Sequence, residues 1–239
     1  MKKIFLLTIS VIVLNATQYF SKIQAYEKHT ISSQVDAKVV FIDKTKEYSF
    51  IDKNSLVLKL DTKDEEIQLN TLKNSLILQK DVVKIKEQNY KNKVKVKQLS
   101  IYNKNQEKLS WIEAKQSLEN IKRDIKTQKR QIEKKEFYVN NQYIDNILVA
   151  QEEYVTTGTK LYTLYNFSKL KLEVFVRDQN IDTIKQKDIF INGKKSDFII
   201  EKIAQVRDEK RISTYKVILA KANNDKNIHF GKVVKVEFK

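Results

Sequence analysis

The sequence of 239 residues contains no cysteine and no proline, and it has only three glycines, one methionine and two histidines. Without cysteine there is no disulfide framework, no thiolate metal site and no cysteine nucleophile. His29 and His229 are far apart in the sequence, and no carboxylate stands at the spacing of a second metal ligand. A single methionine argues against a methionine-rich copper site.

The motifs of common catalytic sites are missing as well. The sequence has no nucleophile–base pair, no Gly-rich phosphate loop and no metal-ligand spacing. We therefore expect a protein that is not an enzyme and that holds no cofactor and no metal.

Negative charge is in short supply, with 30 Asp and Glu against 46 Lys and Arg and a formal net charge of +16. The excess is lysine, spread along the chain and accompanied by abundant Asn and Ile. Arginine is the preferred residue for bidentate contacts to phosphates and bases. A general Lys/Asn/Ile bias explains this composition better than a nucleic-acid site, so we expect no nucleic acid as partner.

The only long hydrophobic run lies at the N-terminus. Lys2 and Lys3 precede apolar residues 4–14, and a polar stretch then ends in Ala25. This order is typical of a secretory signal, and the run is shorter than the roughly 20 residues of a transmembrane helix. We expect export with cleavage after Ala25 in preference to Ala16. An uncleaved anchor is the alternative.

Residues 62–136 have the pattern of two long helices folded back on each other. Each helix is predicted to begin with a capping box, in which a hydroxyl residue precedes Glu by three positions. Thr62 precedes Glu65, and Ser110 precedes Glu113. An arm of roughly 30–40 residues at about 1.5 Å per residue spans about 45–60 Å.

The two arms differ in regularity. In the second arm, apolar residues recur at steps of three and four, the spacing of a coiled-coil seam that only Gln128 interrupts: Trp111, Ala114, Leu118, Ile121, Ile125 and Ile132. The first arm carries one stripe of Leu69, Leu72, Leu76 and Val83, and a second, shifted stripe of Leu78, Val82, Ile85, Val96 and Leu99. Polar residues 103–106 predict the turn. Two helices of an ordinary bundle are the alternative, although no other segment supplies helices for them.

The segments on either side of this hairpin share one spacing at a constant offset of 104 residues. Ile51, Asn54, Val57 and Leu60 correspond to Val155, Gly158, Leu161 and Leu164. An apolar residue, a turn residue that tolerates positive φ and two further apolar residues predict a strand–turn–strand unit. Two copies indicate two halves of one small β domain, with the hairpin inserted between them.

From Lys169 onward the pattern is that of short strands with one helical turn. Gly193 and Gly231 mark turns. The pattern predicts a small β-barrel with strands at 170–176, 188–192, 198–206, 214–220 and 232–238 and a helical turn at 178–185.

The order of these parts resembles the HlyD-like periplasmic adaptor, or membrane fusion protein, family. Ile51–Asp61 is similar to the family pattern of Val, two polar residues, Gly, two residues, Leu and a closing Leu-Asp before a hairpin. Residues 137–176 resemble the return half, and Gly231-Lys232 stands where the family has Gly-Met. The resemblance runs from about Val35 to the C-terminus. Asn54 in place of Gly and Asn140-Asn141 in place of Ala-Pro are departures from it.

The resemblance implies an elongated α+β protein with four parts. These are a signal peptide (1–25), a split biotinyl-lipoyl-like β domain without cofactor (26–61 plus 137–168), an antiparallel α-helical coiled-coil hairpin (62–136) and a β-barrel domain (169–239). Lys53 lies near the turn that carries the modified lysine of true carrier domains. Modification of Lys53 is not expected, because such domains are cytosolic and have no helical insertion.

The implied function is that of an adaptor subunit of a tripartite efflux system in the periplasm of a Gram-negative cell, associated with the inner membrane. It would link an inner-membrane pump of the RND or ABC type to an outer-membrane channel and assemble as a homo-oligomer, a trimer or a hexamer. A type I secretion adaptor, or an exported coiled-coil scaffold or binding protein, is the alternative.

The family's channel-docking motif at the hairpin tip is most nearly matched by Lys95, Leu99 and Ser110, with four extra residues before Ser110. In the alternative interpretation, Leu99 belongs to the seam and Ser110 only caps a helix. Asn54, Gly158 and Gly231 are the predicted structural turns.

Overall fold

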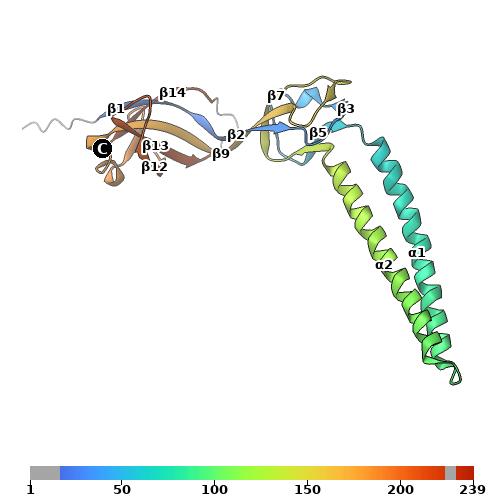
Figure 1. Ribbon diagram of the computed structural model, residues 1–239. Helices are drawn as coiled ribbons and strands as arrows, with labels where there is room; N and C mark the ends of the chain where they lie inside the picture. The colour runs from blue at the N-terminus through green and yellow to red at the C-terminus, as the bar shows by residue number, and fades with distance from the viewer. Residues whose placement is uncertain (1–16, 224–229) are drawn as a thin grey trace, which may run out of the picture. The chain divides into compact units, whose positions relative to one another are not determined.

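The computed structural model describes residues 17–223 and 230–239 (Figure 1). Residues 1–16 of the predicted signal peptide (1–25) and His229 lie outside the described residues. The chain forms two compact units. Unit 1 comprises Tyr165–Lys239 together with the N-terminal residues up to His29, and unit 2 is Thr30–Leu164.

Unit 2 contains a β core whose strands come from both sides of the hairpin. They are β3 (Ala37–Ile42), β4 (Ser49–Ile51), β5 (Ser55–Leu60), β6 (Glu136–Val139), β7 (Gln142–Ile147), β8 (Tyr154–Val155) and the beginning of β9 (Lys160–Arg177). β4 pairs with β7 and β3 pairs with β8, both antiparallel, so each half lends its short strand to the other half. β5 also pairs with β3 and β6.

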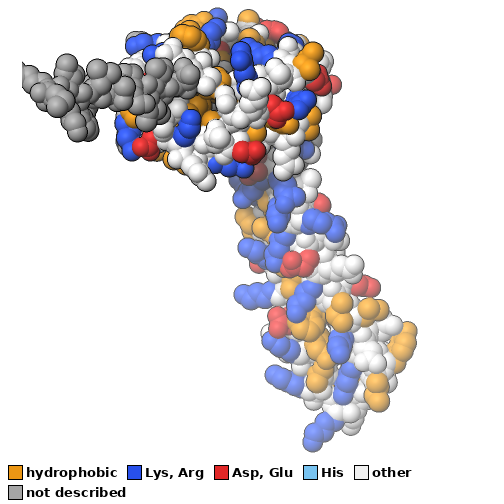
Figure 2. All heavy atoms as spheres, turned by 90° about the vertical axis from the view of Figure 1, so that its left-hand side faces the viewer, with side chains coloured by type: hydrophobic (Ala, Val, Ile, Leu, Met, Phe, Trp, Pro, Cys, Tyr) orange, Lys and Arg blue, Asp and Glu red, His pale blue; other side chains and the backbone are white. Residues whose placement is uncertain are grey.

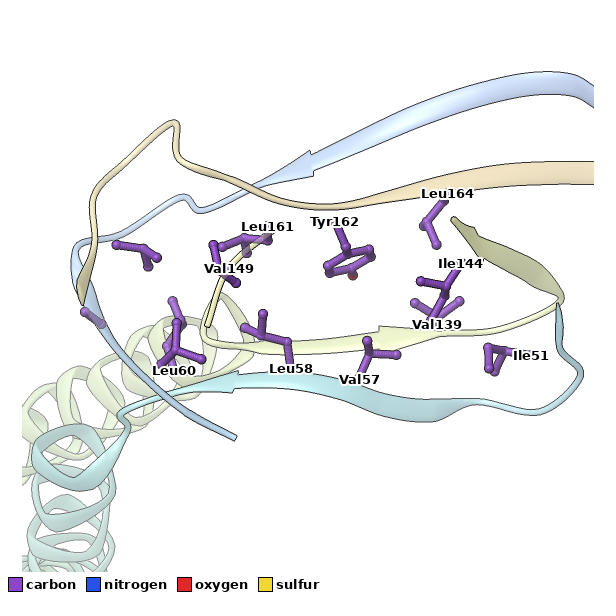
Figure 3. Close-up of a cluster of buried hydrophobic side chains, with 13 residues drawn as sticks. Ile51, Val57, Leu58, Leu60, Val139, Ile144, Val149, Leu161, Tyr162 and Leu164 are labelled. Atoms are coloured by element: carbon purple, nitrogen blue, oxygen red, sulfur yellow. The ribbon is translucent and has the colours of Figure 1, made fainter. Parts of the chain in front are cut away.

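The apolar residues of the repeat form the interior of this core. Val57, Leu58 and Leu60 of β5 and Leu161, Tyr162 and Leu164 of β9 are all buried, and Figure 3 shows them between the same strands. The predicted split β unit is thus one core built from two halves. Val57 and Leu58, like Leu161 and Tyr162, are consecutive residues, so simple alternation does not account for their burial, and the register of β5 against β6 shifts between Leu56 and Leu58. Removal of these apolar side chains from water stabilises the core.

The backbone supports the repeat at a position that the sequence pattern did not reveal. Tyr48 and Glu152 both have positive φ, 56° and 70°, and they are also 104 residues apart. Gly158 has the predicted positive φ of 90°. Asn54 does not have a positive φ, so its predicted conformation is wrong. The Ser55 hydroxyl donates to the Lys53 carbonyl (3.0 Å), and this connection closes without a left-handed residue.

The hairpin consists of α1 (Lys63–Lys95) and α2 (Ile101–Glu133), two helices of 33 residues each. Ser100 is the cap of α2, since its hydroxyl accepts from the Asn103 N–H (3.3 Å). The predicted cap at Ser110 and turn at 103–106 are therefore wrong, because these residues lie inside α2. Asn, Lys and Gln are polar, but only Gly or Pro would interrupt a helix strongly.

The predicted capping box at the start of α1 is also wrong. The Lys63 N–H donates to the Asp61 carboxylate (3.1 Å), and the Thr62 hydroxyl donates to Glu66 (2.6 Å). Glu65 instead accepts from Lys135, a residue that follows α2 (2.7 Å). A contact across the base of the hairpin thus takes the place of the local cap.

Unit 1 is built from strands close to the predicted positions. They are β1 (Gln18–Lys22), β2 (Gln24–Ser32), the rest of β9, β10 (Ile189–Ile191), β11 (Lys194–Lys195), β12 (Ile199–Arg207), β13 (Thr214–Ala222) and β14 (Val233–Phe238). Short 3₁₀ turns at Asp178–Asn180 and Ile184–Gln186 replace the predicted helical turn. Gly193 and Gly231 have positive φ of 81° and 89°, as turns require.

β1 and β2 were not predicted from the sequence. β1 pairs with β14 from Gln18 to Lys22, and Tyr19 and Ile23 pack against the core of unit 1. Ala25 lies inside β2. Cleavage after Ala25 would remove β1 from the fold, whereas cleavage after Ala16 would leave all of it in place.

Candidate functional site: the helical hairpin

On each helix, half-buried or buried residues recur at steps of three and four and define one line, which we call the seam. It includes Leu69, Leu72, Leu76, Gln79, Val83, Lys86 and Tyr90 of α1, and Glu107, Trp111, Ala114, Leu118, Ile121, Ile125, Gln128 and Ile132 of α2. The rings of Tyr90 and Trp111 stack at 5.7 Å, and the Gln79 amide donates to the Ala114 carbonyl (2.9 Å). The predicted apolar rows of both arms, apart from the shifted second row of α1, therefore form this contact.

Gln128, the predicted interruption, is part of the seam. Its amide donates to the Glu65 carbonyl (3.2 Å). A polar residue is accommodated there because its donor finds a backbone acceptor on the other helix.

Ion pairs attach the base of the hairpin to the β core. Lys135 Nζ lies 2.7 Å from Glu65 and 2.8 Å from the Asp61 carbonyl. Lys59 of β5 lies between Glu136 (2.9 Å) and Glu66 (3.2 Å). Hydrogen bonding to Glu136, and then to Glu66, raises the pKa of Lys59, while the Thr62 hydroxyl and Lys59 lower the pKa of Glu66.

The apex of the hairpin is the five-residue connection 96–100. The N–H groups of Val96 and Leu99 donate to the Lys93 and Val96 carbonyls. Lys93 and Glu107 form an ion pair across the helices just below it (2.5 Å), and this hydrogen bond lowers the pKa of Glu107. The ion pair fixes the register of the last turns.

The structure places two of the three predicted docking residues at this apex. Lys95 is the exposed last residue of α1, and Leu99 is half-buried in the connection. Ser110 lies ten residues after Ser100, about 15 Å along α2, and is half-buried directly before the seam residue Trp111. Lys95 and Leu99 are thus close together, and Ser110 is not with them.

Sequence reasoning missed two exposed apolar residues beside the apex. Ile101 and Tyr102, at the start of α2, are 77% and 69% exposed. The predicted turn at 103–106 lies six to seven residues after the observed connection 96–100, so these two residues were not recognised as the start of the second helix. Apolar residues directly after a hydroxyl N-cap would have been the signal.

Two further apolar patches lie away from the seam. On α1 they are Leu78, Val82 and Ile85, the shifted stripe of the first arm, and on α2 they are Leu109 and Ile112. In the described parts of the chain, no helix is long and apolar enough to cross a membrane, and no three His, Asp or Glu side chains gather as metal ligands do.

Comparison with solved structures gives this arrangement a context, although no family model and no curated sequence matches the chain. The membrane fusion protein Spr0693 from Streptococcus pneumoniae R6 superposes with a TM-score of 0.71 at 7% identity, covering 93% of this chain and 98% of that one. A MacA–MexA chimera with the Pseudomonas aeruginosa MexA α-hairpin domain gives 0.64 at 13%, covering 94% and 81%.

MacA from Actinobacillus actinomycetemcomitans gives a TM-score of 0.58 at 15% identity, covering 94% of this chain and 78% of that one. At such identities the likeness concerns the fold and not the function. The chain has the α+β fold of the membrane fusion, or periplasmic adaptor, proteins.

Proposed function

We propose that this chain is the adaptor subunit of a tripartite efflux system, exported to the periplasm, where it links an inner-membrane pump of the RND or ABC type to an outer-membrane channel. The observation that carries the proposal is the insertion of two 33-residue helices between the halves of one β core. In this interpretation, the split core is the biotinyl-lipoyl-like domain, the strands of unit 1 are the β-barrel domain, and the hairpin is the coiled coil.

The hairpin apex is the proposed contact with the channel. The arms extend about 50 Å from the β core, which places residues 95–102 as far from it as the chain allows. Val96, Ile101 and Tyr102 expose apolar surface there, and Leu99 lies half-buried among them. Exposed apolar side chains grouped at the end of a helical hairpin are suited to a packed protein contact.

The lateral apolar patches support self-association as a ring. The patch of α1, Leu78, Val82 and Ile85, differs from the patch of α2, Leu109 and Ile112. When two different surfaces of one subunit meet, the contact is heterologous and closes as a ring if the rotation permits. Such a contact is compatible with a trimer or a hexamer, whereas an isologous dimer would need one patch to meet itself.

Single cysteines test the channel contact, since the natural chain has none. Ile101→Cys at the apex and Ile67→Cys near the base are similarly exposed, at 77% and 65%. In whole cells, a thiol-to-amine crosslinker should join only the Ile101→Cys protein to an outer-membrane channel. Equal crosslinking from both positions, or no crosslinking from the apex, would contradict the proposed contact between the apex and the channel.

The ring is tested separately with Ile85→Cys and Ile112→Cys. The two cysteines in one chain should give a ladder of crosslinked species above the dimer, because each subunit then bonds two neighbours. Each single variant should remain a monomer on the same gel. A dimer from Ile85→Cys alone would instead indicate a two-fold contact, as an exported scaffold could have. A type I secretion adaptor is distinguished from an efflux adaptor by the identity of the pump that co-purifies with the chain.

A further inference from the structure

The lysines of the hairpin follow a rule that the sequence alone did not reveal. Nine of them directly follow a seam residue in the sequence, four in α1 and five in α2: Lys73, Lys80, Lys84 and Lys91, and Lys108, Lys115, Lys122, Lys126 and Lys129. All nine are exposed. We call this set the basic face.

These nine lysines lie on one flat side of the hairpin. Successive residues of an α-helix are 100° apart, so each lysine points about 100° away from the seam, in the same rotational sense. Because α1 and α2 run antiparallel with their seams facing, this rotation turns both rows toward the same side. Figure 2 shows Lys and Arg side chains gathered along one side of the helices.

The opposite flat side has no cation. It consists of the residues that directly precede the seam residues, and none of them is Lys or Arg: Gln68, Thr71, Ser75, Leu78, Val82, Ile85 and Asn89, and Gln106, Ser110, Glu113, Ser117, Asn120, Asp124, Thr127 and Gln131. A chain rich in lysine would place lysine on both solvated sides if solubility were the only requirement. The segregation therefore calls for another cause.

Few of the nine charges are neutralised within the hairpin. Lys91 pairs with Glu87 (2.7 Å) and Lys122 with Glu119 (2.6 Å), while Lys115 lies over the Trp111 ring (3.9 Å). Among the described residues, the other six have no acidic partner within ion-pair distance. Two parallel rows of like charge on neighbouring helices repel each other, so folding gains nothing from this arrangement.

We propose that the basic face binds a linear polyanion, a phosphate-rich polymer lying along the hairpin. The α1 row, from Lys73 to Lys91, is about 27 Å long, and the α2 row, from Lys108 to Lys129, about 32 Å. The rows are about 10 Å apart, the ordinary distance between packed helices. The length suits a chain of many charges rather than a single small anion.

The chemistry of the face selects against nucleic acid. None of the fifteen residues that directly follow a seam residue is an arginine, which could make bidentate contacts to base edges, or an aromatic residue, on which bases could stack. Lysines act as point charges toward phosphate oxygens. A polymer without bases is therefore the matching ligand.

The inference is tested on the purified full-length chain with long-chain polyphosphate as the probe. One variant replaces Lys73, Lys80, Lys84 and Lys126 with Gln, and a matched variant replaces Lys185, Lys187, Lys194 and Lys202 of unit 1, which are exposed as well. Each variant lowers the net charge by four. Counterion release at about 0.7 per contact makes each lysine worth about threefold to fourfold in affinity at 0.15 M salt. The hairpin variant should bind on the order of 100-fold more weakly and the unit 1 variant less than about threefold.

A relocation variant separates position from net charge. Lys80→Gln and Lys84→Gln combined with Ser75→Lys and Ser117→Lys move two charges to the opposite side. This variant should lose affinity about as much as the double Gln change alone. Equal losses from the hairpin and unit 1 variants, full binding by the relocation variant, or no binding of polyphosphate by the natural chain would each overturn the inference. Ile112 directly follows the seam residue Trp111 and so lies on the same side as the basic face, which means that the proposed ring contact would cover part of this face. The measurements are therefore made on the monomeric chain, and they need neither pump nor channel.

Discussion

Removal of residues 17–25 is the perturbation whose effect the structure defines most sharply. β1 forms a ladder with β14 over five residue pairs. Tyr19 packs edge-to-face on Phe238 (5.8 Å), Ile23 joins the same core, and the Ser21 hydroxyl donates to the Glu173 carbonyl (2.8 Å). A chain that begins at Tyr26 loses all of these contacts, and one that begins at Thr17 keeps them.

The magnitude follows from two half-buried apolar side chains and a few hydrogen bonds. Burial of the two side chains contributes about 3 kcal/mol, and net hydrogen bonding about 2 kcal/mol more. A loss of about 5 kcal/mol is comparable to the whole stability of a small domain. Unit 1 should therefore be largely unfolded in the shorter chain, while the helical signal from unit 2 remains.

Urea unfolding, followed by near-UV circular dichroism for the packing of aromatic side chains such as Tyr19 on Phe238 and by far-UV signal for the helices, measures this difference. The chain from Thr17 should show the transition of both units, and the chain from Tyr26 only that of unit 2. N-terminal sequencing of the exported protein should give Thr17 if the signal is cleaved. Equal urea midpoints for both chains, or a mature terminus at Tyr26 on a stable protein, would refute the reasoning.

Four further substitutions probe the hairpin and the turns, and a fifth probes the ion pair below the apex. Leu118→Asp places a charge in the seam and should lower the free energy of unfolding by about 3 kcal/mol or more. Leu78→Asp, at a site that is 68% exposed, should change it by less than about 0.5 kcal/mol in urea titrations. Similar losses of stability in both variants would show that Leu78 is packed. Gly158→Val should cost about 1–2 kcal/mol from its φ of 90° alone, since no atom lies within 4 Å of an added Cβ. Asn54→Gly should destabilise by about 0.5–1 kcal/mol through backbone entropy, and a higher melting temperature would contradict the observed φ. The Lys93 hydrogen bond lowers the pKa of Glu107 in the folded protein, so the ion pair stabilises the apex at pH values above the ordinary glutamate pKa of 4.5, and this stability is lost as the pH falls through the lowered pKa. Amide exchange near the apex should therefore become faster at low pH, and Glu107→Gln should remove this pH dependence. An unchanged pH dependence in the variant would exclude Glu107 as its source.

The hairpin and the split core were accessible from the sequence because both leave periodic signals. Rows such as Leu69–Leu72–Leu76 repeat every three to four residues, and the 104-residue offset repeats a spacing. The residues at which the two helices begin and end were harder to predict. Ser110 was predicted as the cap of the second helix because it precedes Glu113 by three positions, whereas Ser100 is the cap in the structure, and the apolar Ile101 after it was not recognised as a start signal.

The N-terminal strands and the basic face escaped prediction for different reasons. β1 is a polar edge strand whose partner, β14, lies more than 200 residues later, so no local pattern identifies it. The segregation of lysine depends on where the seam lies. The sequence alone predicted two apolar stripes on the first arm and did not decide which one faces the second helix. The gathering of lysines on one side became visible only when the stripe of Leu69, Leu72, Leu76 and Val83, together with Tyr90, was seen to face α2.

The insertion of the hairpin between the two halves of the core has a consequence for how the protein reaches its native state. β5 and β6 are neighbours in space but about 75 residues apart in the chain, and closing a flexible loop of that length costs on the order of 4 kcal/mol of entropy. The packing of α1 against α2 brings Leu60 and Glu136 within reach of each other and so lowers the entropy cost of pairing β5 with β6. The hairpin then acts as an internal template for assembly of the core, and a defect in the seam would slow the formation of strands about 50 Å from the apex. During synthesis the β core must also wait, because its last strand emerges after the entire helical insertion has been made.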